Sequence, residues 1–180
     1  SSDVCSSDLV LEIGAGIGEN TEFLLECGFN VCATDISSIS VEVMKKRFSK
    51  YGNFSSEVAD MENLPFDNES FDMACMAGCL SYGDNTKVMN EIYRVLRLGG
   101  GLIVVDSLNH NPIYKFNRNV HYLRGNRSKS TLNRMPTVGL IERYSDKFGY
   151  AEVSYFGAIT WLFPTLSWIM SEELIASFSN

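Results

Sequence analysis

Short apolar runs alternate with amphipathic stretches along the first hundred residues. The apolar runs predict buried strands at residues 10–13, 30–34, 57–59, 71–77 and 101–107. Between them, apolar residues at helical spacing predict helices at 19–27, 40–51 and 85–96. The glycines after the last helix predict a turn at 97–100. This alternation predicts an α/β fold, with a doubly wound, mostly parallel sheet between helices. Such sheets bind ligands at the carboxyl ends of their strands.

The pattern changes after residue 106. Residues 107–135 are rich in Asn, Arg and Tyr, and we expect a helix at 112–123 followed by a loop. A helix at 136–148 and an alternating edge strand at 150–156 are predicted next. The apolar stretch 158–170 is expected to be buried under a strand, and the alternative is an exposed patch for dimerisation or membrane-surface contact.

The first apolar run ends in three glycines, Gly14, Gly16 and Gly18. A strand, a glycine turn and a helix N-terminus bring backbone N–H groups close to a ligand. Asp35 ends the second strand, where a carboxylate would hold the ribose hydroxyls of a bound nucleoside. The spacing is G-x-G-x-G, whereas dinucleotide sites have G-x-G-x-x-G, and Glu19 replaces the third glycine. Because a carboxylate there repels a pyrophosphate, the turn favours a phosphate-free nucleoside over a nicotinamide cofactor.

Residues 10–107, and above all VLEIGAGIGEN at 10–20, resemble the class I S-adenosylmethionine (SAM)-dependent methyltransferases, in particular the small-molecule, methyltransferase type 11-like group. The resemblance implies a Rossmann-like fold, SAM as cofactor and transfer of its methyl group to an acceptor. Asp60 would accept the adenine amino group, and the backbone of Met61 would lie against the ring. Taken alone, an Asp before a loop is more often a cap or turn residue. The implied cofactor site comprises Glu12, Gly14, Ala15, Gly16, Gly18, Asp35, Ile36, Asp60, Met61, Ala77 and Gly78. We expect Cys75, Met76 and Cys79 to pack in the core instead.

The ends of the sequence do not fit the family pattern. SDVCSSDL at residues 2–9 resembles a translated sequencing adapter, so residues 1–9 are set aside as a non-native leader. Residues 10–180 are then expected to form one methyltransferase domain, with 107–135 as an acceptor-binding lid. Nothing in the sequence supplies the helix that usually precedes the first strand or the final antiparallel strand, so we expect the chain to be a fragment that lacks both.

Basic charge is concentrated in one part of the chain. Residues 107–150 carry 8 Lys and Arg against 2 Asp and Glu, although the whole chain has a net charge of -7. Together with a weaker resemblance of 107–135 to the lids of bacterial methyltransferases that modify surface polysaccharides and sugars, this favours a small or glycan-type, anionic acceptor. The candidate acceptor-binding residues are Tyr82, His110, Arg118, His121, Tyr122 and Arg124, with Arg127 and Arg134 as further basic groups.

His110 is the candidate catalytic base if the acceptor is a hydroxyl. A lone histidine in an Asn-rich turn is more often a structural hydrogen-bonding group, and a solvated basic face is the alternative role of the arginines. Two other functions also stay open: an RNA methyltransferase, against which the acidic remainder of the chain argues, and a non-catalytic SAM-binding or interaction domain.

Composition also bears on whether the chain contains disulfides, a metal site or a membrane-spanning segment. The five cysteines form no C-x-x-C pair, so neither disulfides nor a metal site is indicated. No apolar span of 18 residues occurs, so a transmembrane segment is not expected. We therefore expect a cytoplasmic protein that binds no DNA.

Overall fold

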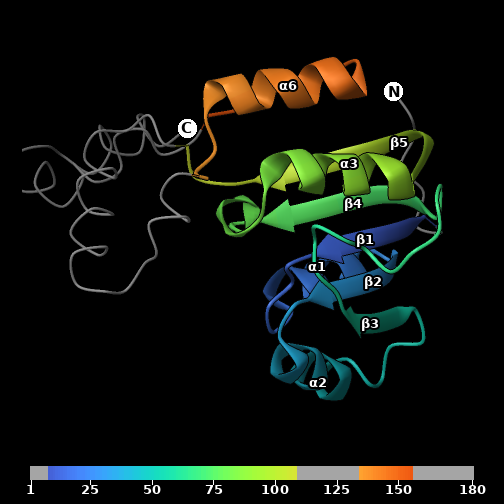
Figure 1. The fold of residues 1–180 in the computed structure, drawn as a ribbon. Coiled ribbons are helices and arrows are strands. Elements are labelled where there is room, and N and C mark those ends of the chain that lie inside the picture. The colour runs from blue at the N-terminus through green and yellow to red at the C-terminus, as the bar shows by residue number, and fades with distance from the viewer. Residues whose placement is uncertain (1–7, 109–133, 156–180) are drawn as a thin grey trace, which may run out of the picture. The chain divides into compact units, whose positions relative to one another are not determined.

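The computed structural model describes residues 8–108 and 134–155 (Figure 1). The chain divides into two compact units, Ser1–Phe148 and Gly149–Asn180, and every helix and strand assigned within the described ranges belongs to the first. The strands are β1 (Leu9–Ile13), β2 (Asn30–Asp35), β3 (Phe54–Val58), β4 (Phe71–Ala77) and β5 (Leu96–Val105). The helices are α1 (Glu19–Glu26), α2 (Ser38–Arg47), α3 (Asn85–Val95) and α6 (Val138–Phe148), with a short 3₁₀ turn η1 (Leu80–Tyr82).

The five strands form one parallel sheet in the order β3-β2-β1-β4-β5. β1 lies between β2 and β4, with Ile13 opposite Thr34 on one side and Met76 on the other. The predicted α/β class and parallel sheet are therefore confirmed. Because all strands point the same way, the carboxyl ends of β1, β2 and β4 lie side by side, and the segments that follow them form one edge of the fold (Figure 1).

Apolar side chains form a separate core on each face of the sheet. Leu11 and Ile13 of β1 join a cluster with β4, α3 and α6, to which Ile92 contributes from α3. The opposite cluster joins α1 and α2 to β2, and Met44 of α2 is fully buried in it. The helix α3 shows how the sequence dictates this packing, because its buried residues Val88, Ile92 and Val95 recur at helical spacing.

Several element boundaries differ from the sequence predictions. β1 begins one residue earlier, at Leu9, whose N–H donates to the carboxylate of Asp72 at 2.9 Å. α2 begins at Ser38 because the Ser37 side chain caps it, accepting the N–H of Ser40. β3 covers Phe54–Val58 and not 57–59, since Phe54, Ser55 and Ser56 also pair with β2.

Two segments differ from their predicted form. Residues 97–100, predicted as a turn, are assigned to β5 but pair with no residue of β4. Leu96 lies opposite Phe71 and Gly101 opposite Met73, so the stretch between them bulges out of the ladder, with Gly99 at a φ of 82°. The edge strand expected at 150–156 is not formed over its described part, residues 150–155. Alternating apolar and polar residues favour a strand only where its apolar face can be buried against other residues. Tyr150, Val153 and Tyr155 are exposed, so these residues have no buried apolar face.

None of the helices in the described ranges combines the length and hydropathy needed to cross a bilayer.

Candidate cofactor site at the ends of β1, β2 and β3

The turn between β1 and α1 depends on three glycines with positive φ angles. Gly14, Gly16 and Gly18 have φ values of 68°, 59° and 86°, a region that side-chain-bearing residues rarely adopt. A Cβ on Gly14 would lie 2.9 Å from Sγ of Cys79, and one on Gly18 would overlap the ring of Phe48. A Cβ on Gly16 would meet no atom within 4 Å. Gly14 and Gly18 therefore allow internal packing, whereas Gly16 leaves its outer side open to a ligand.

Asp35 at the tip of β2 reaches this glycine turn. Its Oδ2 accepts the N–H of Gly16 at 2.9 Å, and its Oδ1 accepts the N–H of Ser37 at 2.9 Å. The N–H of Ala15 also donates to the carbonyl of Thr34, so the turn is joined to the end of β2 twice. The carboxylate and the turn thus lie within one site, which is the arrangement that the sequence predicted for a nucleoside.

Glu12 lies beneath the turn. The side chain is 3% exposed and its carboxylate accepts a hydrogen bond from the Thr21 hydroxyl of α1. Burial raises the pKa of Glu12 above its ordinary value, and the Thr21 hydroxyl partly offsets the rise. The structure assigns this carboxylate to the junction of β1 and α1, so its effect on a ligand in the turn would be indirect.

Asp60 follows β3 and closes a tight turn. Its Oδ1 accepts the N–H of Glu62 at 2.9 Å, and its carbonyl accepts the N–H of Asn63 at 3.0 Å. Just before it, the N–H of Ala59 donates to the carbonyl of Asp35 at 3.1 Å, so the Asp60 turn begins beside the β2 tip. Asp60 therefore has the turn role that was the simpler alternative, and it also lies at the edge where the cofactor role was predicted.

Two apolar residues flank these carboxylates differently. Ile36, directly after Asp35, is 73% exposed, whereas the partly buried Met61 packs its side chain against the core. An exposed isoleucine next to a carboxylate is a surface that the flat base of a nucleoside could cover.

The end of β4 supplies the other candidate residues. Gly78 follows Ala77 with a φ of 65°, its N–H donates to the carbonyl of Val105, and a Cβ there would meet nothing within 4 Å. In η1, the N–H of Leu80 donates to Oδ2 of Asp106 at 3.1 Å. The Tyr82 side chain is 64% exposed, and its carbonyl accepts a hydrogen bond from the Arg134 guanidinium at 3.3 Å. Arg134 thus contacts the backbone of η1.

Cys79 connects the β1 and β4 ends, a role that sequence reasoning missed. The residue is 6% exposed, and its thiol donates to the carbonyl of Ile13 at 3.5 Å. Burial raises the pKa of the thiol to about 12, and the charge of Asp106 adds to the rise. The expected core positions of Cys79 and of Met76 are confirmed, whereas Cys75 is only partly buried and lies outside the core cluster. Only the pairing of β1 with β4 could have indicated the contact of Cys79 with the glycine turn.

The remaining predicted residues, His110, Arg118, His121, Tyr122 and Arg124, lie outside the described residues, as does Arg127. Among residues 8–108 and 134–155, no group of three His, Cys, Asp or Glu side chains has an arrangement suited to a metal ion.

Comparison with known proteins agrees with this geometry. A family model described as a methyltransferase domain matches residues 10–100, which include the glycine turn, Asp35 and Asp60. The chain belongs to this family of methyltransferase domains. The resemblance to class I SAM-dependent methyltransferases is thereby confirmed.

A relative by sequence agrees with the assignment. The chain is 32% identical over 105 residues to the uncharacterized methyltransferase YodH of Bacillus subtilis, and the aligned part covers 58% of this chain and 45% of YodH. The chain thus spans less than half the length of that relative.

Two solved structures are similar in fold. The YcgJ protein of Bacillus subtilis superposes with a TM-score of 0.67 at 22% identity, over 82% of this chain and 63% of YcgJ. Phosphoethanolamine N-methyltransferase 1 of Haemonchus contortus, solved with phosphoethanolamine and S-adenosylhomocysteine (SAH), gives a TM-score of 0.53 at 28% identity, over 58% of this chain and 23% of that protein. The Rossmann-like methyltransferase fold is therefore confirmed.

Proposed function

We propose that this domain binds SAM at the ends of β1, β2 and β3 and transfers its methyl group to a small or glycan-type, anionic acceptor. One contact supports the cofactor most directly, the hydrogen bond from the Gly16 N–H to the Asp35 carboxylate. In dinucleotide sites the N–H groups of the glycine turn hold a pyrophosphate. Here that donor faces a carboxylate, and Glu19 lies in the first turn of α1, so the turn suits a nucleoside without phosphate.

Each described residue has a defined task in this proposal. Asp35 holds the ribose hydroxyls while its bonds to Gly16 and Ser37 fix its orientation. Ile36 covers one face of the adenine, and Asp60 accepts the adenine amino group. Gly16 and Gly78 let the backbone approach the ligand because neither position carries a Cβ. SAM, when bound, supplies the electrophilic methyl group, and the protein contributes by holding donor and acceptor in line and away from water.

The cofactor proposal is tested by calorimetry with SAH and, for comparison, NADH. We expect SAH to bind and NADH to give no heat. Asp35→Ala should weaken SAH binding at least about tenfold, because one charged hydrogen-bonding group is lost. Ser56→Ala, on β3 within the sheet, is the control and should bind SAH normally. Binding of NADH without SAH would refute the proposal, and unchanged SAH affinity of Asp35→Ala would remove Asp35 from the site.

The acceptor proposal depends on different observations. Residues 107–150 concentrate basic charge, and the phosphoethanolamine methyltransferase similar in fold was solved with an anionic acceptor. Methyl transfer should be measured on paired acceptors, for example nucleotide sugars and phosphoethanolamine against neutral sugars and a demethylated quinone. Turnover confined to neutral acceptors would contradict the anionic class. Methylation of RNA with a steep salt dependence would favour an RNA substrate instead. His110 remains the sequence-based candidate for a base.

A further inference from the structure

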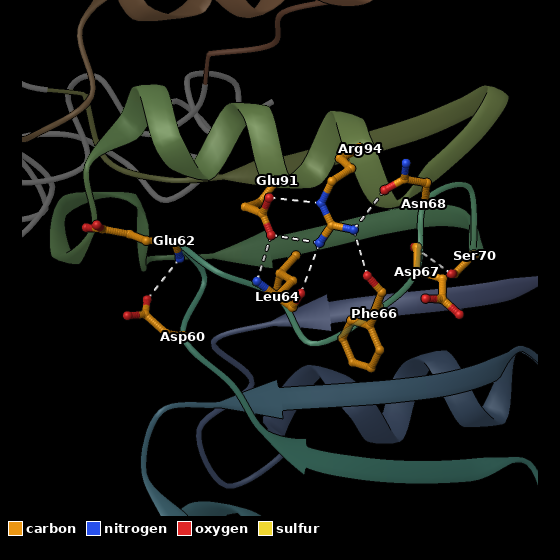
Figure 2. A network of polar contacts seen from close by, with 9 residues as sticks. All are labelled: Asp60, Glu62, Leu64, Phe66, Asp67, Asn68, Ser70, Glu91 and Arg94. Carbon is orange, nitrogen blue, oxygen red and sulfur yellow. Dashed lines mark hydrogen bonds and ion pairs between the residues drawn. The ribbon is translucent and has the colours of Figure 1, made fainter.

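Arg94 on α3 makes an unusually large set of hydrogen bonds to the loop between β3 and β4 (Figure 2). Its Nη2 donates to the carbonyl of Leu64 at 2.9 Å, and its Nη1 donates to the carbonyl of Phe66 at 2.6 Å and to the side-chain oxygen of Asn68 at 3.1 Å. A planar guanidinium can hold several acceptors at fixed angles, which a lysine ammonium cannot do. Arg94 therefore fixes the path of this loop over several residues.

Glu91, one turn earlier on α3, completes the arrangement. Its two carboxylate oxygens accept from Nε and Nη2 of Arg94 at 2.9 and 2.8 Å, a bidentate pair. Oε2 of Glu91, the oxygen that accepts from Nη2, also accepts the N–H of Leu64 at 2.8 Å. Leu64 is thus held through its N–H, its carbonyl and its side chain, which is 4% exposed in the core.

The held residue directly follows the turn that presents Asp60. The turn is closed by the bond from the Asn63 N–H to the Asp60 carbonyl, and the next residue is Leu64. At its other end, the N–H of Ala59 bonds to the carbonyl of Asp35. The Asp60 carboxylate therefore lies on a four-residue turn with one end attached to β2. The other end is attached to α3 through Leu64 and Glu91 (Figure 2).

These contacts suit a positioning role better than a stabilising one. The Arg94 and Glu91 side chains are 31% and 18% exposed, and partly solvated ion pairs usually add little to folding stability. Their directional bonds to backbone carbonyls and an N–H nevertheless restrict where the loop can lie. Small displacements of such a loop matter because a carboxylate discriminates between donor and acceptor groups only at hydrogen-bonding distance.

We propose that Glu91 and Arg94 act together as positioning residues that fix the Asp60 carboxylate and so set the selectivity of the site for a purine with a 6-amino group. This inference rests on the proposed function, since it takes Asp60 to contact the adenine of SAM. With Asp60 in place, adenine offers its amino group as a donor. The 6-oxo base of a deaminated cofactor places an acceptor against the carboxylate and is rejected.

The test compares the affinities of SAH and its deaminated analogue S-inosylhomocysteine by calorimetry. In the native chain we expect SAH to bind at least about tenfold more tightly, the effect of one hydrogen bond to a charged group. In Arg94→Gln the preference should fall below about threefold. Glu91→Gln, which keeps the size of the side chain but disrupts the bidentate pair, should lower the preference in the same direction.

Arg97→Gln provides the matched control. Arg97 also pairs with a carboxylate, Asp72, and bonds to a backbone carbonyl, that of Glu69, but it touches neither the Asp60 turn nor Leu64. Its removal should leave the preference for SAH unchanged. Asp60→Asn should abolish the preference, and adding Arg94→Gln to it should cause no further change, because both substitutions act through the same contact.

The outcomes separate this inference from the proposed function. A folded Arg94→Gln variant with the native preference overturns the inference. If Arg94→Gln does not fold, the measurement on Glu91→Gln takes its place. A folded Glu91→Gln variant that keeps the native preference for SAH also overturns the inference. A native chain that binds SAH and its deaminated analogue equally overturns the inference but leaves the proposed cofactor intact. A native chain that binds neither compound refutes the proposed function itself.

Discussion

The ends of β1 and β4 lie next to each other but are built in different ways. At the β1 end, three glycines with positive φ occur within five residues, and the turn bonds to Asp35 of the adjacent strand. At the β4 end, a single such glycine, Gly78, is followed by η1, whose backbone is held by Asp106 and Arg134. The backbone of the first end is thus set mainly by its own glycines, whereas that of the second is held by Asp106 and Arg134, 26 and 52 residues from the groups to which they bond.

Gly18→Ala should have the largest effect on stability. The new Cβ combines an unfavourable φ of 86° with an overlap with the ring of Phe48, and together we expect a loss of about 2–5 kcal/mol in the free energy of unfolding. Urea denaturation followed by circular dichroism measures it. Gly78→Ala is the control from the β4 end, where the Cβ enters open space, and should cost only about 1–2 kcal/mol. Equal losses would contradict the difference between the two ends.

Gly16→Ala should separate conformational strain from ligand contact. Its Cβ meets no atom within 4 Å, so we expect a loss of stability of about 1–2 kcal/mol, similar to that for Gly78→Ala. If the open side of Gly16 faces the cofactor, affinity for SAH should also fall at least about tenfold, as measured by calorimetry. Native SAH affinity in a folded Gly16→Ala variant would show that the ligand does not approach this residue.

Glu12→Gln should have the smallest effect, visible as a change in pH dependence. Burial raises the folded-state pKa of Glu12, so its contribution to stability is complete below the unfolded pKa and is lost as pH rises through the folded pKa. The amide of the variant has no titrating proton to lose, and its oxygen can still accept from Thr21. The native chain should therefore lose unfolding free energy relative to the Glu12→Gln variant as pH increases from about 4 to about 8. A difference independent of pH would contradict the raised pKa.

The contrast between the two ends also explains what the sequence could reveal. Asp35 was predictable because a strand tip and a glycine turn on neighbouring parallel strands meet by topology alone. The start of α2 was misplaced because its apolar pattern begins after the capping Ser37, which set the true boundary. The turn at residues 97–100 was recognisable from its glycines, but its place as a bulge inside β5 depended on the pairing of Leu96 with Phe71.

Other features could not be derived from local pattern. Glu91 and Arg94 resemble an ordinary pair on an exposed helix surface, and only the folded path of the loop at Leu64 gives them a distinct role. Cys79 resembles any small core residue until β1 and β4 are paired. The turn function of Asp60 was weighed from sequence, but its connection to α3 needed the three-dimensional arrangement.

The contacts of η1 have an evolutionary consequence. The chain is fastened to this short turn at Asp106, through Leu80, and again at Arg134, through Tyr82. Both attachment points are therefore only two residues apart on the same turn, whatever lies between residues 107 and 133. Under the proposed function, in which this stretch contributes to acceptor binding, its exchange between homologues would leave both attachment points in place and change the acceptor without changing the sheet.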